Sequence, residues 1–378
     1  MKKVLHLINN DKKFIDVIIR EFENNSEIEN TFILEINNNT KPETLKKIIC
    51  KTSKELCDVG FIDILKNYDI LFVHSLTASR AKLISKISFN IIIIWGAWGG
   101  DFYHHHPLLK KTLLEEKTAL LEKKLLPYFK EVFGRPILQA IYPQRFLYYW
   151  QQKAIKRINY IAPVIYDDYE LIKEYYLAPH LKYLSFSYGN LEEDLLNGIP
   201  KKFELGDNIL LGNSSTFSNN HIEIIDLLSE INLENRKVIT PLSYGVIKLK
   251  DYLVKYGNEK LNNNFMPLVD FISPEKYHQL LTTCGIVIMN QKRQQGLGNI
   301  VTMLYLGAKV FFNMENPTYN YFKRIGAIVF LIEEIIKNKE SAFSPLSNEQ
   351  ILINREIIVK TRCKLVVEGC INKIKELY

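Results

Sequence analysis

The chain has 378 residues, of which 47% are hydrophobic and 12% aromatic, and this composition suffices for two domains that each bury a core. No stretch approaches the roughly 18 consecutive apolar residues that a membrane-spanning helix needs. The five cysteines form no CxxC pair and no cluster with histidine, which argues against a zinc site and a disulfide framework and indicates reduced thiols.

The net charge of +7 at pH 7 is concentrated in one segment of the chain. Residues 102–157 contain eleven Lys or Arg and four Glu, so this segment alone carries +7 and the remaining residues balance to zero. A uniformly basic protein would indicate a nucleic-acid partner, whereas one basic segment indicates one basic surface. We therefore expect no nucleic-acid partner. The alternative is a basic nucleic-acid binder, which salt-dependent retention of DNA or RNA would reveal.

The first hundred residues alternate apolar runs with amphipathic stretches. The apolar run at the N-terminus is short and contains His6, so it indicates a first buried strand and not a signal peptide. Runs of β-branched residues without alternation predict strands buried on both faces, hence a parallel sheet flanked by helices. We expect strands at 4–8, 31–36, 68–74 and 90–95, and helices at 14–22, 42–50 and after 77.

A glycine-rich turn, GAWGGDFY, follows the most apolar of these strands. It contains Asp101, and a partly desolvated carboxylate at a strand end gains basicity, so Asp101 is a candidate general base. It also suits the N-cap of a following helix. His74 ends its own strand and is the second candidate base, with a packed, hydrogen-bonded histidine as the other interpretation.

Residues 104–157 differ from the rest because leucines recur at helical spacing between flanking lysines. Helices of this kind can rest on an anionic bilayer surface. They can equally dock on a sheet with a solvated basic face. Three adjacent histidines at 104–106 cannot readily chelate one ion from a helix, so we expect no bound metal there.

The second half restarts the alternation of strands and helices. A linker-like composition near 185–205 predicts a domain boundary, with domains at 1–190 and 191–345 and a C-terminal helix at 346–378 that packs back toward the first domain. In the rest of the first domain we expect strands at 158–164 and 181–187 and a helix at 166–176. After it we expect strands at 208–211, 237–240, 264–269, 285–289 and 309–312, and helices at 221–228, 251–256, 274–284, 300–306 and 348–378.

Residues 290–317 form the most informative stretch, because a strand, a glycine loop, a helix and a strand follow one another. Ligands of open α/β sheets bind at the carboxyl ends of strands. Gly296 and Gly298 let a phosphate approach the backbone, the helix start offers free N–H groups, and Arg293 adds a forked cation for a diphosphate. The loop is neither a P-loop nor a dinucleotide fingerprint, and a tight turn without a ligand is the other interpretation.

Three polar loops follow strands of this second half: residues 212–214, 242–245 and 295–298. Because the carboxyl ends of parallel strands share one rim, we expect these loops to surround one ligand. Their Ser, Asn and Gly residues can donate many hydrogen bonds to phosphates and sugar hydroxyls. Helix N-capping by Asn213, Ser214 and Ser218 is an alternative that is compatible with binding.

Four motifs in fixed order resemble one known family: WGAxxGDFY at 95–103, GNSxxxSNxH at 212–221, VxxPxxYG at 238–245, and RQQGLG followed by NxENP within 293–317. In these motifs the chain resembles the 4-acetamido-4,6-dideoxy-D-galactose (Fuc4NAc) transferases of enterobacterial common antigen synthesis, glycosyltransferase family 56. The resemblance covers nearly the whole chain.

The resemblance implies an α/β protein of the GT-B fold, with two Rossmann-like parallel-sheet domains facing across a cleft. It implies transfer from a dTDP-sugar donor to a polyprenyl-diphosphate-linked saccharide. The resemblance also implies a peripheral protein at the cytoplasmic face of the inner membrane. Residues 104–157 would contact the anionic membrane surface. GT-B enzymes generally use helix dipoles and cations for the leaving diphosphate, so we expect no cofactor and no metal, and an inverting course.

The same resemblance gives the site residues their expected roles. Asp101 is the first choice for the base and His74 the second. The expected diphosphate cradle comprises Arg293, Gln295, Gly296, Leu297, Gly298 and Asn299. The other expected donor contacts are Gly212, Asn213, Ser214, His221 and Tyr244, with Glu315 and Asn316 at the ribose or the sugar. A non-catalytic nucleotide-sugar or polysaccharide-binding protein on the same scaffold is the alternative, and it would bind a donor without transferring the sugar.

Overall fold

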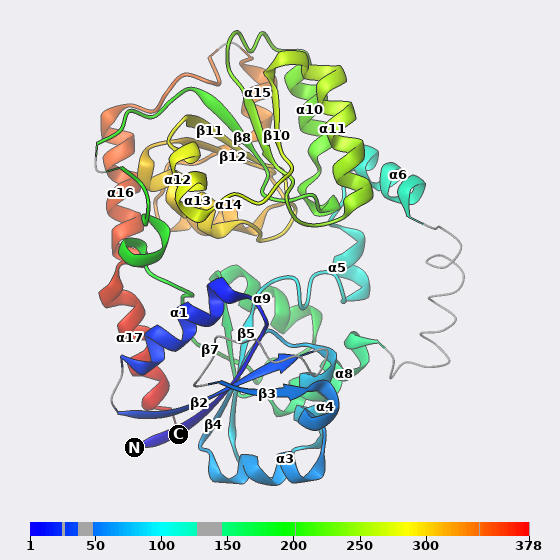
Figure 1. Ribbon diagram of the computed structural model, residues 1–378, viewed down its shortest axis with the longest axis vertical. Coiled ribbons are helices and arrows are strands. Elements are labelled where there is room, and N and C mark those ends of the chain that lie inside the picture. Colours follow the sequence, from blue (N-terminus) through cyan, green and yellow to red (C-terminus); the bar gives the residue numbers. More distant parts are fainter. Residues whose placement is uncertain (25–26, 37–47, 127–145, 201, 340, 378) are drawn as a thin grey trace. The chain divides into compact units, whose positions relative to one another are not determined.

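A computed structural model describes residues 1–24, 27–36, 48–126, 146–200, 202–339 and 341–377 (Figure 1). The chain divides into two compact units, in which residues 111–132 fall outside the expected first domain and the end of the chain returns to it, as expected. Unit 1 comprises Met1–Lys110, Phe133–Asn190 and Lys364–Tyr378, and unit 2 comprises Lys111–Val132 and Leu191–Cys363. A segment of the first half of the chain therefore belongs to unit 2, and the last residues return to unit 1.

The described part of unit 1 contains a seven-stranded sheet in the order β3-β2-β1-β4-β5-β6-β7, with every pairing parallel. This is the doubly wound arrangement that the uninterrupted apolar runs predicted. The strands are β1 (Lys2–Ile8), β2 (Ile28–Ile36), β3 (Ile48–Thr52), β4 (Ile70–His74), β5 (Ile92–Ala97), β6 (Tyr160–Pro163) and β7 (Lys182–Tyr183).

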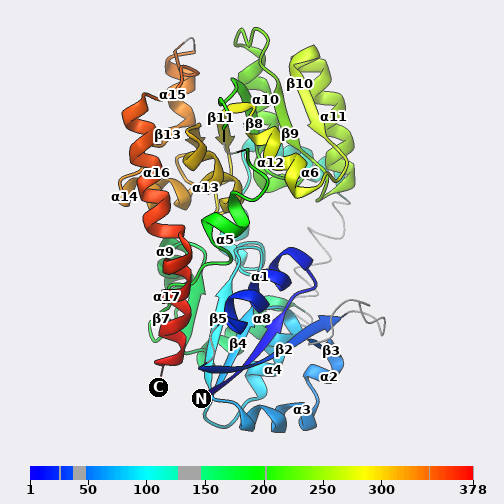
Figure 2. The same ribbon diagram turned by 60° about the vertical axis from the view of Figure 1, so that its left-hand side comes forward.

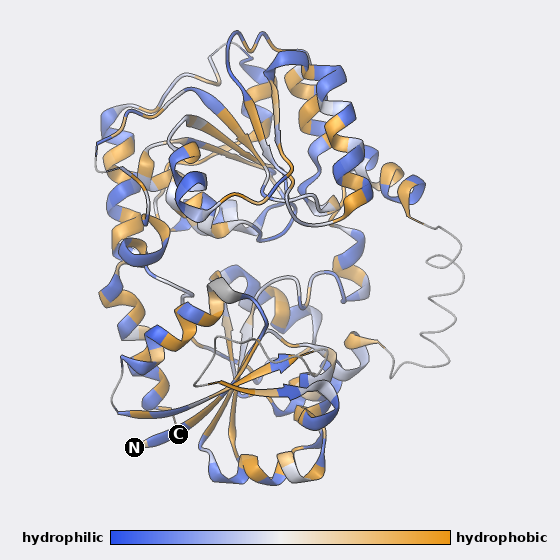
Figure 3. Ribbon diagram, viewed as in Figure 1, coloured by the Kyte–Doolittle hydropathy of each residue, from blue (hydrophilic) through white to orange (hydrophobic). Residues whose placement is uncertain are grey.

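Helices cover both faces of this sheet (Figure 2). They are α1 (Lys12–Glu23), α2 (Ser53–Leu56), α3 (Val59–Ile64), α4 (Ala78–Lys86), α5 (Pro107–Lys111), α8 (Leu147–Ala154), α9 (Tyr166–Tyr175) and α17 (Lys364–Lys375). On one face α1 and α17 contact each other, and Phe22 and Ile371 from these helices join Phe72 of β4 in one core. Hydrophobic residues, orange in Figure 3, predominate in the central strands, although β1 begins with Lys2 and Lys3 and β4 ends with His74.

Two predicted elements of unit 1 differ in the structure. The expected helix at 42–50 falls partly on residues 42–47, which lie outside the described part, and Ile48–Thr52 forms the strand β3. The β-branched Ile48 and Ile49 pair with β2 at the sheet edge, so pairing there overrides the helix signal given by Pro42. The strand expected at 181–187 is only two residues long.

The described part of unit 2 contains a second parallel sheet, of six strands in the order β10-β9-β8-β11-β12-β13. Successive residues of its strands face opposite sides of the sheet. Leu211 of β8 and Ile288 of β11 therefore join the core formed with α10 (His221–Ser229) and α11 (Ile247–Leu261). On the other side, Phe312 of β12 stacks on Phe322 of α14 (Pro317–Arg324). The strands are β8 (Asn208–Leu211), β9 (Val238–Pro241), β10 (Phe265–Leu268), β11 (Cys284–Met289), β12 (Lys309–Phe312) and β13 (Phe330–Leu331).

The helices of unit 2 include one that comes from the first half of the chain. They are α6 (Glu116–Leu125), α10 (His221–Ser229), α11 (Ile247–Leu261), α12 (Pro274–Leu281), α13 (Leu297–Leu306), α14 (Pro317–Arg324), α15 (Ile332–Lys337) and α16 (Asn348–Arg362). Helix α6 packs on α10, with Leu121 in the core of unit 2. Glu223 accepts hydrogen bonds from the backbone N and Oγ1 of Thr118 at 2.8 and 2.6 Å.

The leucine-rich segment and the C-terminus are less continuous than their patterns predicted. Among described residues, 104–157 forms three short helices, α5, α6 and α8, and residues 127–145 lie outside the described part. The single helix expected at 348–378 is two helices, because Cys363 is extended with a ψ of 161°. No helix in the described ranges is both long and apolar enough to cross a membrane.

Candidate functional site

The loop between β11 and α13 has the geometry of an anion site. Gly296 is the residue before α13 and adopts the left-handed conformation, with a φ of 68°. A Cβ there would also lie 3.2 Å from Asn213 Cγ, so both backbone conformation and space favour glycine. Gly298 is exposed in the first turn, and no described side chain caps the helix start. The first N–H groups of α13 and its positive dipole end can therefore bind an anion.

Asn213 joins the three predicted loops at the carboxyl edge of this sheet. Its Nδ2 donates to the hydroxyl of Tyr244 at 2.9 Å, and its Oδ1 accepts from Gln295 Nε2 at 2.9 Å. Gln295 also donates to Ser214 Oγ at 3.3 Å and accepts from Ser218 Oγ at 2.8 Å. The loops after β8, β9 and β11 are thus one hydrogen-bonded unit. Its members Asn213, Ser214, Ser218 and Gln295 are buried, whereas Tyr244 is 59% exposed.

Two further residues, Asn219 and Gln291, hold this unit together, and neither was among the site residues predicted from the sequence. Asn219 Oδ1 accepts from the backbone N of Asn213 at 3.1 Å and from Gln291 Nε2 at 2.6 Å. Its Nδ2 donates to Ser214 O at 2.9 Å. Both residues were visible as polar positions next to a buried strand or inside the GNSxxxSNxH motif, which is the signal that could have identified them.

His221 begins α10 and lies against the turn at Gly212. It is 2% exposed, and its Nε2 has no hydrogen-bond partner in the described part of the chain. A Cβ on Gly212, which has a φ of 64°, would lie 2.7 Å from this nitrogen. Burial lowers the pKa of His221 to about 3, so the ring is neutral near pH 7 and can donate or accept one hydrogen bond without a change in charge.

An ion-pair cluster lies beyond β11 and β12. Lys292 Nζ is 2.8 Å from Glu315 Oε1 and 3.3 Å from Glu115 Oε1. Asn313 Nδ2 also donates to Glu115 Oε1, at 2.9 Å. Burial lowers the pKa of Lys292, but the hydrogen bond to Glu315 and the charge of Glu115 outweigh it and raise that pKa above its ordinary value. Glu115 reaches this edge because the segment before α6 belongs to unit 2.

The remaining predicted donor residues lie in unit 2 with different environments. Arg293 is 8% exposed, and its Nη1 donates to Gln294 O at 3.0 Å. Asn299 donates to the hydroxyl of Tyr277 at 2.8 Å. Leu297 is buried, so only its backbone can contact an anion. Asn316 is fully buried and caps α14 by accepting from the backbone N of Thr318, which is a structural role.

Asp101 is placed in unit 1, where it ties the glycine-rich turn to the sheet. Its Oδ2 accepts from the backbone N of Leu76 at 2.9 Å and from Trp95 Nε1 at 2.8 Å, and its Oδ1 accepts from the backbone N of Trp98 at 3.0 Å. Burial raises the pKa of this carboxyl, while the three N–H donors oppose the rise. These contacts favour a positioning role over a base, and the carboxylate does not cap a helix.

His74 is also in unit 1 and is completely buried. Its Nε2 lies 3.1 Å from His6 Nδ1, and its Nδ1 lies 2.9 Å from the hydroxyl of Tyr188. Burial, followed by the neighbouring His6 and Arg80, holds the pKa of His74 well below its ordinary value. With both ring nitrogens engaged inside the core, this histidine is positioned to orient Tyr188.

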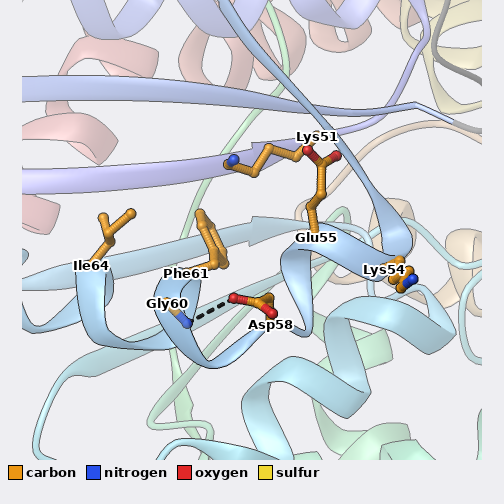
Figure 4. A pocket seen from close by; sticks show the side chains of 7 residues that line it. All are labelled: Lys51, Lys54, Glu55, Asp58, Gly60, Phe61 and Ile64. Atoms are coloured by element: carbon orange, nitrogen blue, oxygen red, sulfur yellow. Dashed lines mark hydrogen bonds between the residues drawn. The ribbon is translucent and has the colours of Figure 1, made fainter.

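A separate pocket of about 460 Å³ lies beside the edge strand β3 in unit 1 and contains none of the predicted residues (Figure 4). Its acidic side chains serve the local helices: Glu55 forms a capping box with Thr52, and Asp58 Oδ1 accepts from Gly60 N at 2.9 Å. The lining residues are Lys51, Lys54, Glu55, Asp58, Gly60, Phe61 and Ile64. We assign no ligand to it. The described residues also contain no group of three His, Cys, Asp or Glu suited to a metal ion.

Comparison with known proteins identifies the family. A family model described as 4-alpha-L-fucosyltransferase, glycosyl transferase group 56, matches residues 144–353, more than half of the chain. The chain belongs to glycosyltransferase family 56. The protein is therefore a glycosyltransferase, and the matched range contains every predicted site residue of unit 2, whereas Asp101 and His74 lie outside it.

Solved structures with the same architecture are similar to this family-56 glycosyltransferase over its whole length. The apo form of the lipopolysaccharide outer core galactosyltransferase WaaB is 12% identical, covers 100% of both chains and has a TM-score of 0.60. A glycosyltransferase from Rickettsia africae is 12% identical with a TM-score of 0.61, over 99% of this chain and 98% of that one. HepE from Anabaena, in complex with UDP-glucose, is 12% identical with a TM-score of 0.58 over 100% of both chains. Such identities show the fold alone, which is GT-B, as the sequence predicted.

Proposed function

We propose that this glycosyltransferase moves a deoxy-amino sugar of the Fuc4NAc kind from a dTDP-sugar to a polyprenyl-diphosphate-linked saccharide. The four ordered motifs support this choice of donor and acceptor, and the family match supports glycosyl transfer. The observation that carries the proposal is the hydrogen-bonded rim of unit 2, where Asn213, Tyr244 and Gln295 join three loops beside the exposed start of α13.

The diphosphate of the donor would lie on the first turn of α13. The exposed Gly298 lets a phosphate oxygen approach the backbone amides, and the helix dipole stabilises its negative charge. Arg293 supplies a permanent positive charge in the same loop. These groups stabilise the dTDP that leaves when the acceptor oxygen attacks the anomeric carbon, and we propose an inverting course without a bound metal. Transfer that persists in excess EDTA would support the last point, and loss restored by Mg²⁺ would refute it.

The sugar and ribose would lie beside the Glu315–Lys292 pair. Glu315 keeps 55% of its side chain exposed while its oxygen accepts from Lys292, so it can still accept hydrogen bonds from sugar hydroxyls. His221 and the turn at Gly212 complete the buried side of the rim.

We propose that the acceptor side includes residues 104–157 and that this segment rests on the anionic cytoplasmic face of the inner membrane, with the protein peripheral. Leu108 and Leu120 are each 59% exposed, and Lys110 and Lys123 follow them two and three residues later. Exposed leucines beside lysines suit an anionic interface. Flotation with anionic and with neutral vesicles tests this, and equal absence of binding to both at low salt would contradict it.

The donor proposal is tested by thermal unfolding with dTDP-sugars, dTDP and UDP-glucose, because a ligand that binds the folded state raises Tm. We expect a rise with dTDP-sugars that Arg293→Ala reduces. Arg236→Ala is the matched control, since Arg236 pairs with Glu234 and lies two residues before β9, at the amino end of the strand, whereas the proposed site lies at the carboxyl ends.

The outcomes separate the candidate functions. No shift with any nucleotide sugar would refute the donor proposal. A shift without transfer to polyprenyl-diphosphate-linked saccharides would favour the non-catalytic binding protein.

A further inference from the structure

Three aromatic side chains gather at the carboxyl edge of the unit 1 sheet. Phe14 lies in the first turn of α1, after β1, and Trp98 follows β5 directly. Their ring centroids are 4.5 Å apart, and Trp98 stands edge-on to Tyr188 with centroids 5.1 Å apart. All three residues are half-buried, unlike the fully buried aromatics inside this sheet's core, such as Phe22 and Phe72. We call these three residues the aromatic platform.

A directed chain of hydrogen bonds fixes Tyr188. Asn30 Nδ2 donates to the carbonyl of Phe22 at 3.0 Å, so Asn30 Oδ1 must accept from His6 Nε2, which lies 3.0 Å away. Because His6 is neutral, its Nδ1 then accepts from His74 Nε2. His74 is also neutral and carries its one ring proton on Nε2. Its Nδ1 is therefore an acceptor, and the Tyr188 hydroxyl donates to it.

The sheet also makes room for the hydroxyl of Tyr188. A Cβ on Gly96 of β5 would lie 2.2 Å from this oxygen, a distance that no side chain can adopt. The hydroxyl thus occupies the space that a residue other than glycine would fill. Tyr188 is anchored at its polar end, and its ring is held in one orientation at the sheet edge.

Asp101 fixes the second member of the platform. Its Oδ1 accepts from the backbone N of Trp98, and its Oδ2 holds the backbone N of Leu76 and the indole of Trp95. The carboxylate therefore ties the turn that carries Trp98 to the ends of β4 and β5. The two residues that the sequence suggested as bases each hold one ring of the platform.

We propose that the aromatic platform binds a pyranose ring of the acceptor saccharide, and that His74 and Asp101 are positioning residues for it. This rests on the proposed function for the identity of the acceptor. Rigid aromatic faces at the carboxyl edge of a parallel sheet suit a ligand with an apolar C–H face. Apart from the indole N–H of Trp98 and the Tyr188 hydroxyl, which is engaged by His74, the three side chains are hydrocarbon, so they suit an uncharged ring better than a phosphate.

Binding is tested first without the transfer reaction. The wild-type protein is titrated with methyl glycosides of N-acetylhexosamines and with free thymidine, with tryptophan fluorescence and saturation-transfer NMR as readouts. We expect glycosides to bind, Trp98→Ala to lose about tenfold in affinity, and Trp98→Phe to retain most of it. Phe89→Ala is the matched control, because Phe89 is also half-buried in unit 1 but precedes β5, at the amino end of that strand. Binding of thymidine at Trp98 in place of glycosides would overturn the proposal.

The second test separates positioning from proton transfer. In the transfer assay, His74→Asn and Trp98→Ala should raise KM for the lipid-linked acceptor and leave kcat and the KM of the donor within about twofold. A large loss of kcat at unchanged acceptor KM would assign His74 a chemical role and contradict the inference. If wild-type protein binds glycosides through Trp98 but transfers no sugar, the donor proposal fails and the platform stands; if it transfers sugar but Trp98→Ala changes no acceptor parameter, the platform fails alone.

Discussion

At the scale of single residues, Gly296 and Gly298 look alike in the sequence but differ in the structure. Gly296 has a φ of 68° and faces Asn213, whereas Gly298 has an ordinary φ, and a Cβ there would make only a 3.7 Å contact with Leu195. Left-handed backbone costs an alanine about 1–2 kcal/mol. Alanine substitutions at the two positions therefore distinguish the cost of the left-handed backbone from the effect of an added methyl group.

We expect Gly296→Ala to lower the free energy of unfolding by about 1–2 kcal/mol and Gly298→Ala to leave it unchanged or raise it by up to about 1 kcal/mol. Urea unfolding monitored at unit 2 measures both. Equal destabilisation by the two substitutions would contradict the left-handed geometry of the loop.

The buried His221 predicts that the folded protein loses stability as the pH falls below 6.5. Its pKa in the folded protein is about 3, below the value of about 6.5 in an unfolded chain, so the unfolded state binds one more proton between these values. The stability that neutral His221 contributes is present above pH 6.5 and is lost as the pH falls from 6.5 toward 3. Lowering the pH from 6.5 to 5 should therefore cost about 2 kcal/mol through this residue.

The check is the number of protons taken up on unfolding at pH 5, which should be about one lower in His221→Asn than in the wild type. A substitution at His180, which is exposed, serves as the control. The same uptake in His221→Asn and wild type would mean that His221 is already protonated in the folded protein.

The contrast between the two glycines and Asp101 shows what the sequence could predict at this scale. A glycine before a helix pattern predicts a left-handed turn because the reason is local. The role of Asp101 depends on the backbone of Leu76 and the indole of Trp95, which come from β4 and β5, and no local pattern contains that information. The polar rim of unit 2 was predictable as a set, while its cross-links through Asn219 and Gln291 were not.

At the scale of elements, α6 is the feature that the sequence did not assign correctly. Its leucines and lysines predicted an amphipathic helix, but the pattern does not say which core receives the apolar face. Asn220, in left-handed conformation before α10, holds the segment that leads into α6 against unit 2. Its Nδ2 donates to Leu113 O at 3.1 Å, and its Oδ1 accepts from Glu115 N at 2.9 Å. Likewise the helix predicted at 42–50 is wrong at Ile48–Cys50, which belong to β3, because pairing with β2 is not encoded in these residues alone.

Asn220→Gly keeps the left-handed backbone but removes these hydrogen bonds, and we expect it to cost about 2–3 kcal/mol and to speed amide exchange in α6. Glu234→Gly is the matched control, because Glu234 is also left-handed, with a φ of 52°, but lies on the surface. Hydrogen exchange of residues 116–125 measures the effect. Unchanged protection of α6 in Asn220→Gly would show that this asparagine does not hold the segment.

At the scale of the whole molecule, unit 2 is discontinuous along the chain. A fragment of residues 191–363 lacks α6, and with it Leu121 of the core and the partner of Glu223. We expect this fragment to unfold at a lower temperature than unit 2 of the full chain, and a synthetic peptide of residues 111–126 to raise its Tm. The same peptide with Leu121→Asp is the control. A fragment that is stable alone and indifferent to the peptide would contradict this division of the chain.

The most direct test of the central claim is a structure of the protein with dTDP or a dTDP-sugar bound. The diphosphate should lie within hydrogen-bond distance of the first backbone amides of α13, beside Gly298, with the rest of the nucleotide along the rim formed by Asn213, Tyr244 and Gln295. A nucleotide bound away from that helix start, or a first turn of α13 that remains covered by protein in the complex, would contradict the account.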